Sequence, residues 1–339
     1  MGIQELVKVS TLFARLSRQS DRPAARPRVI QRHRIRRDTG LMYDIFEPQQ
    51  ESRSTLIALH GASPCGKNDR RLQHLARCLA LSRVTCVTPH LPGLAELQWS
   101  PSDVDKLVEL IQHLIGQQKR RLGLVGFSHG ASYALLAAAR GEVSSSIRFV
   151  VSFGAYHSFP ELYRHFLEGS TPPRTKAEWD NWLFLKSVQV FRQRERLGLD
   201  PLLMRELKDF LMRYGQLKDL RKKKQFYDTR LKDLDAARLD YDTTDPSALE
   251  ALSPNGKLSA LSCPVILIHD PRDNLVPSVH AQRIYDELER LPNADRHRLL
   301  ITRLMTHVNL GSAARPVEVV KLLSYLSCLV EPEAAPDQA

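Results

Sequence analysis

The segment that most constrains the fold of this chain is an apolar run that leads into a serine flanked by two glycines. Residues 122–126 have the length and composition of a buried strand, and an alanine-rich helical run begins just past Ser128. The pattern Gly126-x-Ser128-x-Gly130 predicts a sharp turn from strand to helix, because a side chain at either glycine would collide with neighbouring backbone. Such a turn lifts the Ser128 hydroxyl clear of the sheet and directs the first amides of the helix towards the same space. The alternative interpretation is a glycine-rich helix entry with a buried serine.

Strand-like and helical segments alternate along most of the chain. Before the serine, strands are expected at 29–37, 41–47, 54–60 and 84–88, and helices at 68–82 and after 100–101. After it, strands are expected at 149–153, 264–268 and 299–301, and a closing helix at 317–329. This alternation predicts parallel crossover connections and a sheet with helices on both faces, so the fold class is α/β.

Between about 154 and 255 the pattern is helical throughout. Helices are expected at 161–167, 176–192, 201–214 and 217–238, and no strong strand signal interrupts them. This stretch therefore predicts a helical insertion between the sixth and the seventh strand. Within it, the run from Arg221 to Lys224 is interpreted as a solvated helix face, because runs of like charge usually face solvent.

Four motifs in order resemble those of the α/β-hydrolase superfamily. They are His60-Gly61 after the third strand, Gly126-Phe127-Ser128-His129-Gly130, Asp273-x-x-Val276-Pro277 after the seventh strand, and His307 after the eighth. The resemblance covers roughly 29–155 and 255–330. It implies the α/β-hydrolase fold, which is a mostly parallel central sheet with helices on both faces and, here, an inserted helical cap.

The resemblance also implies a catalytic triad. Ser128 would be the nucleophile, His307 would accept its proton and return it to the leaving group, and Asp273 would orient the imidazole. Asp270 stands where the family usually has glycine, and it is the alternative acid.

Two backbone amides would stabilise the oxyanion that develops during acyl transfer. The match assigns them to His129 and Ala62, with Ser63 as the alternative to Ala62. These assignments imply a serine hydrolase of carboxylesterase or lipase type that cleaves a small-molecule carboxylic ester with a hydrophobic acyl group. The alternatives are an amidase or peptidase, an acyltransferase on the same triad, and a non-catalytic binding protein. The implied mechanism needs no cofactor and no metal.

Positive charge is concentrated at the N-terminus. Ten Lys or Arg and two acidic residues lie within residues 1–37, so this stretch holds +8 of the net charge of +11. Apolar residues at helical spacing over 3–16 predict a basic amphipathic arm that spans residues 1–28. The arm either contacts an anionic membrane surface weakly or packs on the hydrolase body. A nucleic-acid partner is not expected, because no recognition module accompanies the basic residues.

The cysteine pattern and the hydropathy limit the compartment and the class of protein that we expect. The five cysteines are scattered and form no Cys-x-x-Cys pair, which favours a reducing compartment. No apolar run reaches the roughly 18 residues of a membrane-spanning helix. We therefore expect a cytoplasmic protein, with peripheral membrane contact through the arm as an alternative. The expected division is the arm (1–28), a core (29–155 and 253–330), a cap (156–252) and a disordered tail (331–339).

Overall fold

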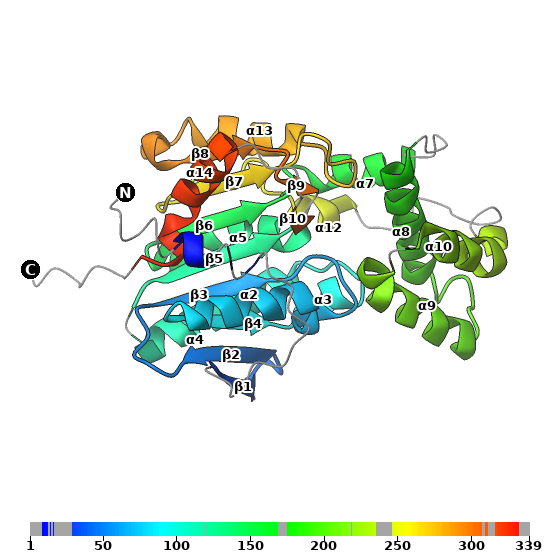
Figure 1. Cartoon of the computed structure of the whole chain (residues 1–339), viewed down its shortest axis with the longest axis horizontal. Helices are drawn as coiled ribbons and strands as arrows, with labels where there is room; N and C mark the ends of the chain where they lie inside the picture. Colours follow the sequence, from blue (N-terminus) through cyan, green and yellow to red (C-terminus); the bar gives the residue numbers. More distant parts are fainter. Residues whose placement is uncertain are drawn as a thin grey trace, which may run out of the picture.

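The computed structural model describes residues 9–12, 14, 16, 29–118, 120–168, 175–217, 219–234, 246–306, 309–310 and 316–331. Within these residues, one eight-stranded sheet has the strand order β1-β2-β4-β3-β5-β6-β7-β8 (Figure 1). Strand β2 is antiparallel to both of its neighbours, β1 and β4, whereas β3 to β8 run parallel to one another. The prediction of a mostly parallel sheet is confirmed.

The strands follow the expected ranges closely. They are β1 (Val29–Ile35), β2 (Met42–Pro48), β3 (Ser54–Leu59), β4 (Val84–Pro89), β5 (Leu122–Phe127), β6 (Ile147–Phe153), β7 (Val265–His269) and β8 (Arg298–Ile301). Two further short strands, β9 (Met305–Thr306) and β10 (Asn309–Leu310), pair with each other outside this sheet.

Strand β3 illustrates why continuous apolar runs form the middle of the sheet. All six of its residues are buried. Successive side chains of a strand point to opposite faces, so Leu56 and Ala58 join the hydrophobic cluster on one face and Ile57 and Leu59 the cluster on the other. The last four positions of this strand, which are covered on both faces, are accordingly all apolar, whereas the two residues at its start are polar.

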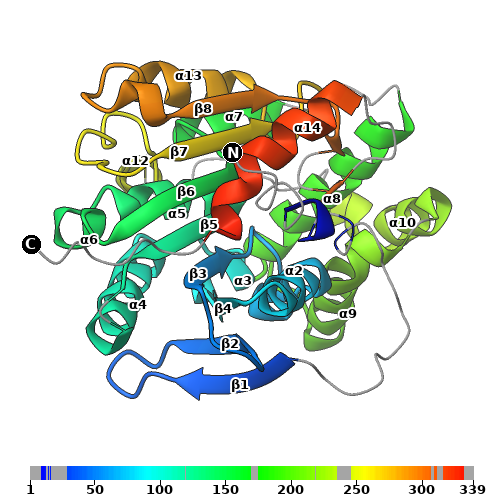
Figure 2. The ribbon, with the colours of Figure 1, turned by 60° about the vertical axis from the view of Figure 1, so that its left-hand side comes forward.

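Helices cover both faces of the sheet (Figures 1 and 2). One hydrophobic cluster includes residues of α4, α5, α12 and α13, and the other includes residues of α2, α14 and η5. The helices of the body are η1 (Gly66–Asn68), α2 (Arg70–Leu81), α3 (Pro92–Ala95), α4 (Ser102–Gln118), α5 (His129–Ala138), α6 (Gly141–Ser144), α7 (Phe159–Glu168), α12 (Pro246–Ala251), α13 (Val279–Leu288), η4 (Ala294–Arg296), α14 (Pro316–Tyr325) and η5 (Leu326–Leu329). None of the described helices is both long and apolar enough to cross a bilayer.

The described part of the N-terminal arm packs on the second of these faces. Val9 and Leu12 are 1% and 2% exposed and belong to the same cluster as α2 and α14. In this arrangement the Leu12 side chain is not available for insertion into a membrane. Residues 1–8, 13, 15 and 17–28 of the arm lie outside the described residues, as do residues 332–339 of the expected disordered tail.

The cap lies beyond the carboxyl ends of the parallel strands (Figure 1). It contains α8 (Lys176–Arg192), α9 (Pro201–Arg213), the short η2 (Tyr214–Gln216) and α10 (Leu220–Phe226), which continues into the π-helical turn η3 (Tyr227–Leu231). The expected helices at 176–192 and 201–214 are confirmed, and a hydrophobic cluster made mostly of cap side chains joins them. The helix expected at 217–238 is observed over 220–234 with a π-helical stretch at Tyr227–Leu231, and residues 235–238 lie outside the described residues.

Both ends of the inserted segment contribute to the core of the body. Tyr156, Phe159 and Leu162 near its start, and Leu249 and Leu252 near its end, all belong to the cluster that covers the first face of the sheet. The cap bounds 156–252 stay a prediction as a domain division. The packing nevertheless assigns these buried side chains to the body rather than to the cap's own cluster.

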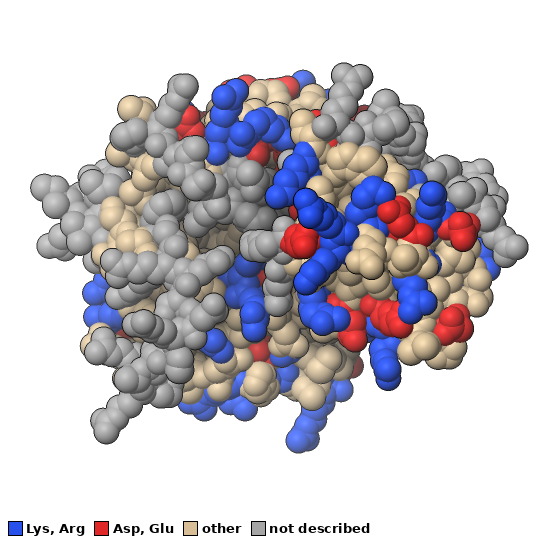
Figure 3. Space-filling view, turned by 45° about the vertical axis from the view of Figure 1, so that its right-hand side comes forward, with Lys and Arg blue, Asp and Glu red and all other residues tan. Residues whose placement is uncertain are grey.

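The surface of the cap carries charges of both signs. Figure 3 shows Lys and Arg side chains interspersed with Asp and Glu on the face that comes forward there. Arg221, Lys222 and Lys224 are exposed, as expected for a solvated helix face. Lys223 is not, because its side chain is 5% exposed and its ammonium group lies 2.6 Å from Oδ1 of Asp180. The interpretation of this run is therefore wrong for one of its four residues.

Candidate active site

Ser128 lies at the tip of the turn between β5 and α5. Its backbone has φ 53° and ψ −124°, a conformation that strains a serine by about 1–3 kcal/mol. The amide of Ser128 donates to the carbonyl oxygen of Phe153 on β6 at 2.7 Å, and its own carbonyl accepts from the amide of Ala131 at 2.8 Å. The neighbouring strand and the first turn of α5 therefore hold Ser128 in a strained conformation.

The two glycines of the motif are required by the tightness of this turn. A Cβ atom at position 126 would lie 2.4 Å from the Cα atom of Ala131, and one at position 130 would lie 2.2 Å from the carbonyl oxygen of His60. Real Cβ atoms do not approach backbone this closely. The collision expected from the sequence is thus confirmed at both positions.

The loop after β3 lies directly against the nucleophile candidate. A Cβ atom built on Gly61 would be 3.1 Å from the Cβ atom of Ser128 and 3.0 Å from the carbonyl oxygen of Phe127. Ala62 follows Gly61, and His129 is the first residue of α5. The two amides assigned to an oxyanion hole therefore belong to segments that flank Ser128.

His60 ties this loop to the loop after β4. Its Nδ1 atom donates to the carbonyl oxygen of Gly61 at 2.8 Å, and its Nε2 atom accepts from the amide of Leu91 at 3.1 Å. Burial lowers the pKa of His60 to about 4. The ring is accordingly neutral, and one tautomer satisfies both hydrogen bonds.

Asp273 and Asp270 occupy one buried turn after β7. Oδ1 of Asp273 accepts from the amides of Leu275 and Val276, both at 3.0 Å, and its Oδ2 lies 3.5 Å from Nε2 of His269. Oδ1 of Asp270 accepts from the amide of Arg272 at 3.0 Å, and the Asp270 carbonyl accepts from the amide of Asp273 at 3.1 Å. Both carboxylates thus shape the loop, Asp270 at its start and Asp273 at its end.

The structure places most of the predicted site residues at one edge of the sheet. The strands β3, β5, β6 and β7 are successive neighbours, and their carboxyl ends carry Ala62, Ser128 and Asp273 in the loops that follow. The carboxyl ends of parallel strands are where ligands bind in folds of this class. The predicted base, His307, lies outside the described residues, so its role stays a prediction.

The cap and the body helix α7 both touch the loops that carry these residues. Asn274, next to Asp273, bonds to the Asn181 side chain of α8, and its carbonyl oxygen accepts from Nε2 of His165 on α7 at 2.9 Å. Ala62 packs against the hydrophobic cluster of the cap. The site is thus built between the sheet edge and the cap.

The side chain of His129 is buried among aromatic rings. Its imidazole stacks on the Trp99 indole with centroids 5.3 Å apart and planes 7° apart, and it meets Tyr156 and Phe159 edge-on, also at 5.3 Å. The sequence interpretation missed Trp99, which lies in the loop after α3. The available signal was a tryptophan directly before the Ser100-Pro101 pair that begins the next helix.

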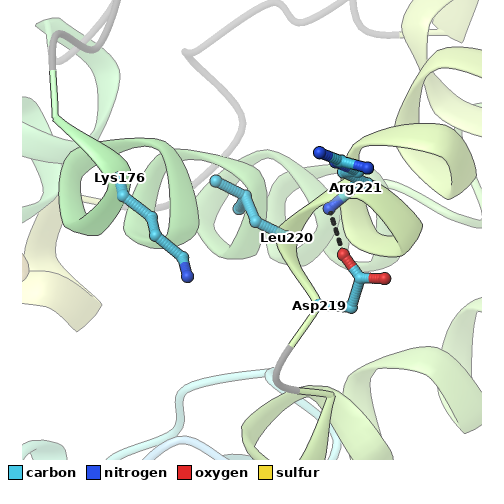
Figure 4. A pocket seen from close by; sticks show the side chains of 4 residues that line it. All are labelled: Lys176, Asp219, Leu220 and Arg221. Atoms are coloured by element: carbon cyan, nitrogen blue, oxygen red, sulfur yellow. Dashed lines mark hydrogen bonds between the residues drawn. The ribbon is translucent and has the colours of Figure 1, made fainter.

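No metal site accompanies these residues in the described part of the chain, where no cluster of three or more His, Cys, Asp and Glu side chains could hold an ion. A pocket of about 540 Å³ is lined by Lys176, Asp219, Leu220 and Arg221 of the cap (Figure 4). Its lining includes none of the predicted catalytic residues. Its acidic member, Asp219, already caps α10 by accepting from the amide of Arg221.

Solved structures share this architecture. The 2,6-dihydroxy-pseudo-oxynicotine hydrolase superposes with a TM-score of 0.51 at 16% identity, over 91% of this chain and 71% of that one. An acylaminoacyl peptidase from Pyrococcus horikoshii gives 0.53 at 13% identity, but the match covers 91% of this chain and only 43% of the peptidase. An esterase from Pyrococcus furiosus gives 0.50 at 14% identity, over 89% and 91% of the two chains. At such identities the likeness concerns the fold alone.

Comparison of the sequence with known families identifies the family to which the chain belongs. A search of curated proteins found no match. The model of the alpha/beta hydrolase family, however, matches residues 56–320, which is most of the chain and includes every predicted site residue. The sharp strand-to-helix turn at Ser128 and the sheet topology are those expected for the family that this model describes. The chain belongs to the α/β-hydrolase family.

Proposed function

We propose that the chain is a serine hydrolase that cleaves a carboxylic ester, with Ser128 as its nucleophile. The observation that carries the proposal is the backbone of Ser128, whose φ of 53° is strained for a residue with a side chain. Such strain persists only where the surroundings enforce it, and it is concentrated at functional sites. A serine with no chemical role could occupy an ordinary turn at a lower cost.

The proposed reaction has two similar halves. His307 takes the proton of the Ser128 hydroxyl as the oxygen attacks the ester carbonyl, and it then protonates the departing alkoxide. The resulting acyl-enzyme is cleaved by water in the same way, with His307 again as the base. Asp273 orients the imidazole, and the amides of His129 and Ala62 donate to the oxyanion of each tetrahedral intermediate.

A hydrophobic acyl group fits the surroundings of the serine better than a sugar. Phe127, the residue before Ser128, stacks on Phe153 with ring centroids 5.0 Å apart. Ala62 faces the apolar cluster of the cap, whose partly buried members include Trp179 and Phe184. Apolar walls favour apolar acyl chains, because their burial removes hydrocarbon surface from water.

Labelling with a fluorophosphonate tests the proposal. The reagent should modify the wild-type protein and the Ser145→Ala control, in which an exposed serine is removed. Ser128→Ala should not be labelled, and its kcat for p-nitrophenyl esters should fall by at least about 10⁴-fold, because removing the nucleophile disables the whole triad. A panel of esters with lengthening acyl chains should show kcat/KM rising beyond acetate.

Three results would contradict the proposal. Labelling of Ser128→Ala at the wild-type rate would place the reactive group elsewhere. Faster turnover of matched anilides than of esters would make amide cleavage the better description, and transfer of the acyl group to an added alcohol in preference to water would indicate an acyltransferase.

A further inference from the structure

The segment that follows α3 belongs to the body of the protein but is buried in the cap. Leu97 is completely buried, and it packs in the same cluster as Leu183 of α8 and Leu207 of α9. Its φ of 56° lies in the left-handed region, which is disfavoured for a leucine and is retained only where the surroundings hold it. The cap therefore fixes the backbone of this segment in a conformation that the segment would not favour by itself.

Arg192, the last residue of α8, holds the segment by two contacts. Its Nε atom donates to the carbonyl oxygen of Leu97 at 3.0 Å. Its guanidinium carbon lies 3.7 Å from the centroid of the Trp99 ring and 5.3 Å from that of Tyr163, distances typical of cation–π contacts. Burial lowers the pKa of Arg192 from its ordinary value, yet a guanidinium stays charged in proteins.

Trp99 also contacts the turn that holds Ser128. The face of its indole stacks on the imidazole of His129 with the two planes 7° apart. His129 follows Ser128 directly and opens α5. Arg192 thus contacts Trp99 and Trp99 contacts His129, so a chain of contacts runs from the cap to the residue whose amide is the proposed oxyanion donor.

We propose that Trp99 is a positioning residue for the oxyanion hole and that the cap, through Arg192, keeps it pressed against His129. The inference rests on the proposed function, because it concerns the His129 amide as a donor to the oxyanion. A preorganised donor is effective only while it stays aimed at the place where the negative charge develops, and displacements of about 1 Å are costly to catalysis. A cap that holds Trp99 would therefore affect the rate of the chemical step as well as the shape of the substrate-binding site.

The test compares five full-length proteins: the wild type, Trp99→Leu, Trp99→Phe, Arg192→Met and Arg205→Met. Trp99→Phe keeps an aromatic face for stacking, and Arg205 is an exposed arginine of α9, so its variant is the matched control. The measurements are kcat and KM for p-nitrophenyl acetate, whose small acyl group makes few contacts, and Ki for a small boronic acid. The boronate adduct of Ser128 is tetrahedral and directs an oxygen into the oxyanion hole. Rates are divided by the fraction of sites that a fluorophosphonate titrates, which removes any unfolded protein from the comparison.

Trp99→Leu and Arg192→Met should lower kcat by about 10- to 100-fold and raise Ki for the boronic acid by the same factor. KM should stay within about threefold of the wild-type value. Trp99→Phe and Arg205→Met should stay within about threefold in all three constants. A raised KM at unchanged kcat and Ki would overturn the inference and leave Trp99 as part of the substrate wall. Should Trp99→Leu not fold, Arg192→Met decides by the same criterion.

The two proposals fail in different ways. If the wild type neither reacts with fluorophosphonate nor hydrolyses any ester, the proposed function fails. If the wild type is active and both Trp99→Leu and Arg192→Met match it in kcat and Ki, only the inference about Trp99 fails.

Discussion

Asp273 and Asp270 are three positions apart in one buried turn, yet their hydrogen bonds differ in kind. Asp273 accepts two amides of the residues that follow it through Oδ1, and its Oδ2 lies on the side of His269. Asp270 instead receives the amide and the Nε atom of Arg272 through one oxygen, at 3.0 and 3.4 Å. Asp270 thus begins the turn, an arrangement that an asparagine side chain can also adopt.

This difference leads to a prediction about the triad acid. Asp273→Asn should lower kcat by about 10³- to 10⁴-fold, because a neutral amide neither stabilises an imidazolium nor fixes the required tautomer. Asp270→Asn should cost less than about tenfold, since Asn keeps the acceptor for the Arg272 amide. Kinetics of both variants on the same ester give the comparison, and a larger loss in Asp270→Asn would reverse the assignment.

The nucleophile turn could be predicted from five residues because its geometry is local. Only Gly fits at 126 and 130, and the strand and helix on either side are adjacent in sequence. Trp99 and Lys223 could not be placed in the same way. Their partners, His129 and Asp180, lie 30 or more positions away in the sequence, so only the tertiary fold brings them together.

The helices of the inserted segment pack in two different places. Helices α8, α9 and α10 share their own cluster, whereas α7 and α12 contact each other and pack on the sheet. Helical periodicity located α8 correctly, and a capping box of Thr175 and Glu178 defines its first turn. Periodicity could not reveal which of the inserted helices pack on the body, because an apolar stripe does not identify the surface that covers it.

This division predicts different outcomes for two deletions. Removing residues 169–245 with a flexible linker should leave a body that still unfolds cooperatively, because α7 and α12 keep their places. Removing 156–252 should destabilise the body strongly, since it also takes Tyr156, Phe159 and Leu249 from the core and each large buried side chain contributes about 2–5 kcal/mol. Urea unfolding followed by circular dichroism separates the two, and equal stability of the two shortened chains would show that the buried ends contribute little.

At the scale of the whole molecule, buried histidines such as His60 and His280 make stability depend on pH. Burial lowers the pKa of His60 to about 4 and also that of His280 to about 4. In the unfolded chain each histidine titrates near its ordinary value of about 6.5. The unfolded state therefore binds more protons between pH 6.5 and 4, and the free energy of unfolding falls as the pH falls through this window.

Replacing one of these histidines should reduce that dependence. In His60→Asn, the difference in proton uptake at this site disappears, while Asn can still offer both a donor and an acceptor. The slope of the free energy of unfolding between pH 6 and 4.5 should then decrease by up to about 1.4 kcal/mol per pH unit relative to the wild type. Urea titrations at several pH values measure the slope, and parallel curves for the two proteins would contradict a depressed pKa for His60.

The pairing of β6 with β7 also has a consequence for how the chain folds. Val150 pairs with Val265, so more than a hundred residues form the loop that this pair must close. The entropy lost on closure rises by about 0.6 kcal/mol with each doubling of loop length. Once α7 and α12 are in contact, pairing β6 with β7 closes only the short stretches between each strand and its neighbouring helix. The entropy lost in this step is then small. We expect the contact between α7 and α12 to bring β6 and β7 within reach of each other, so an early contact between these two helices would let β7 and β8 join the sheet sooner.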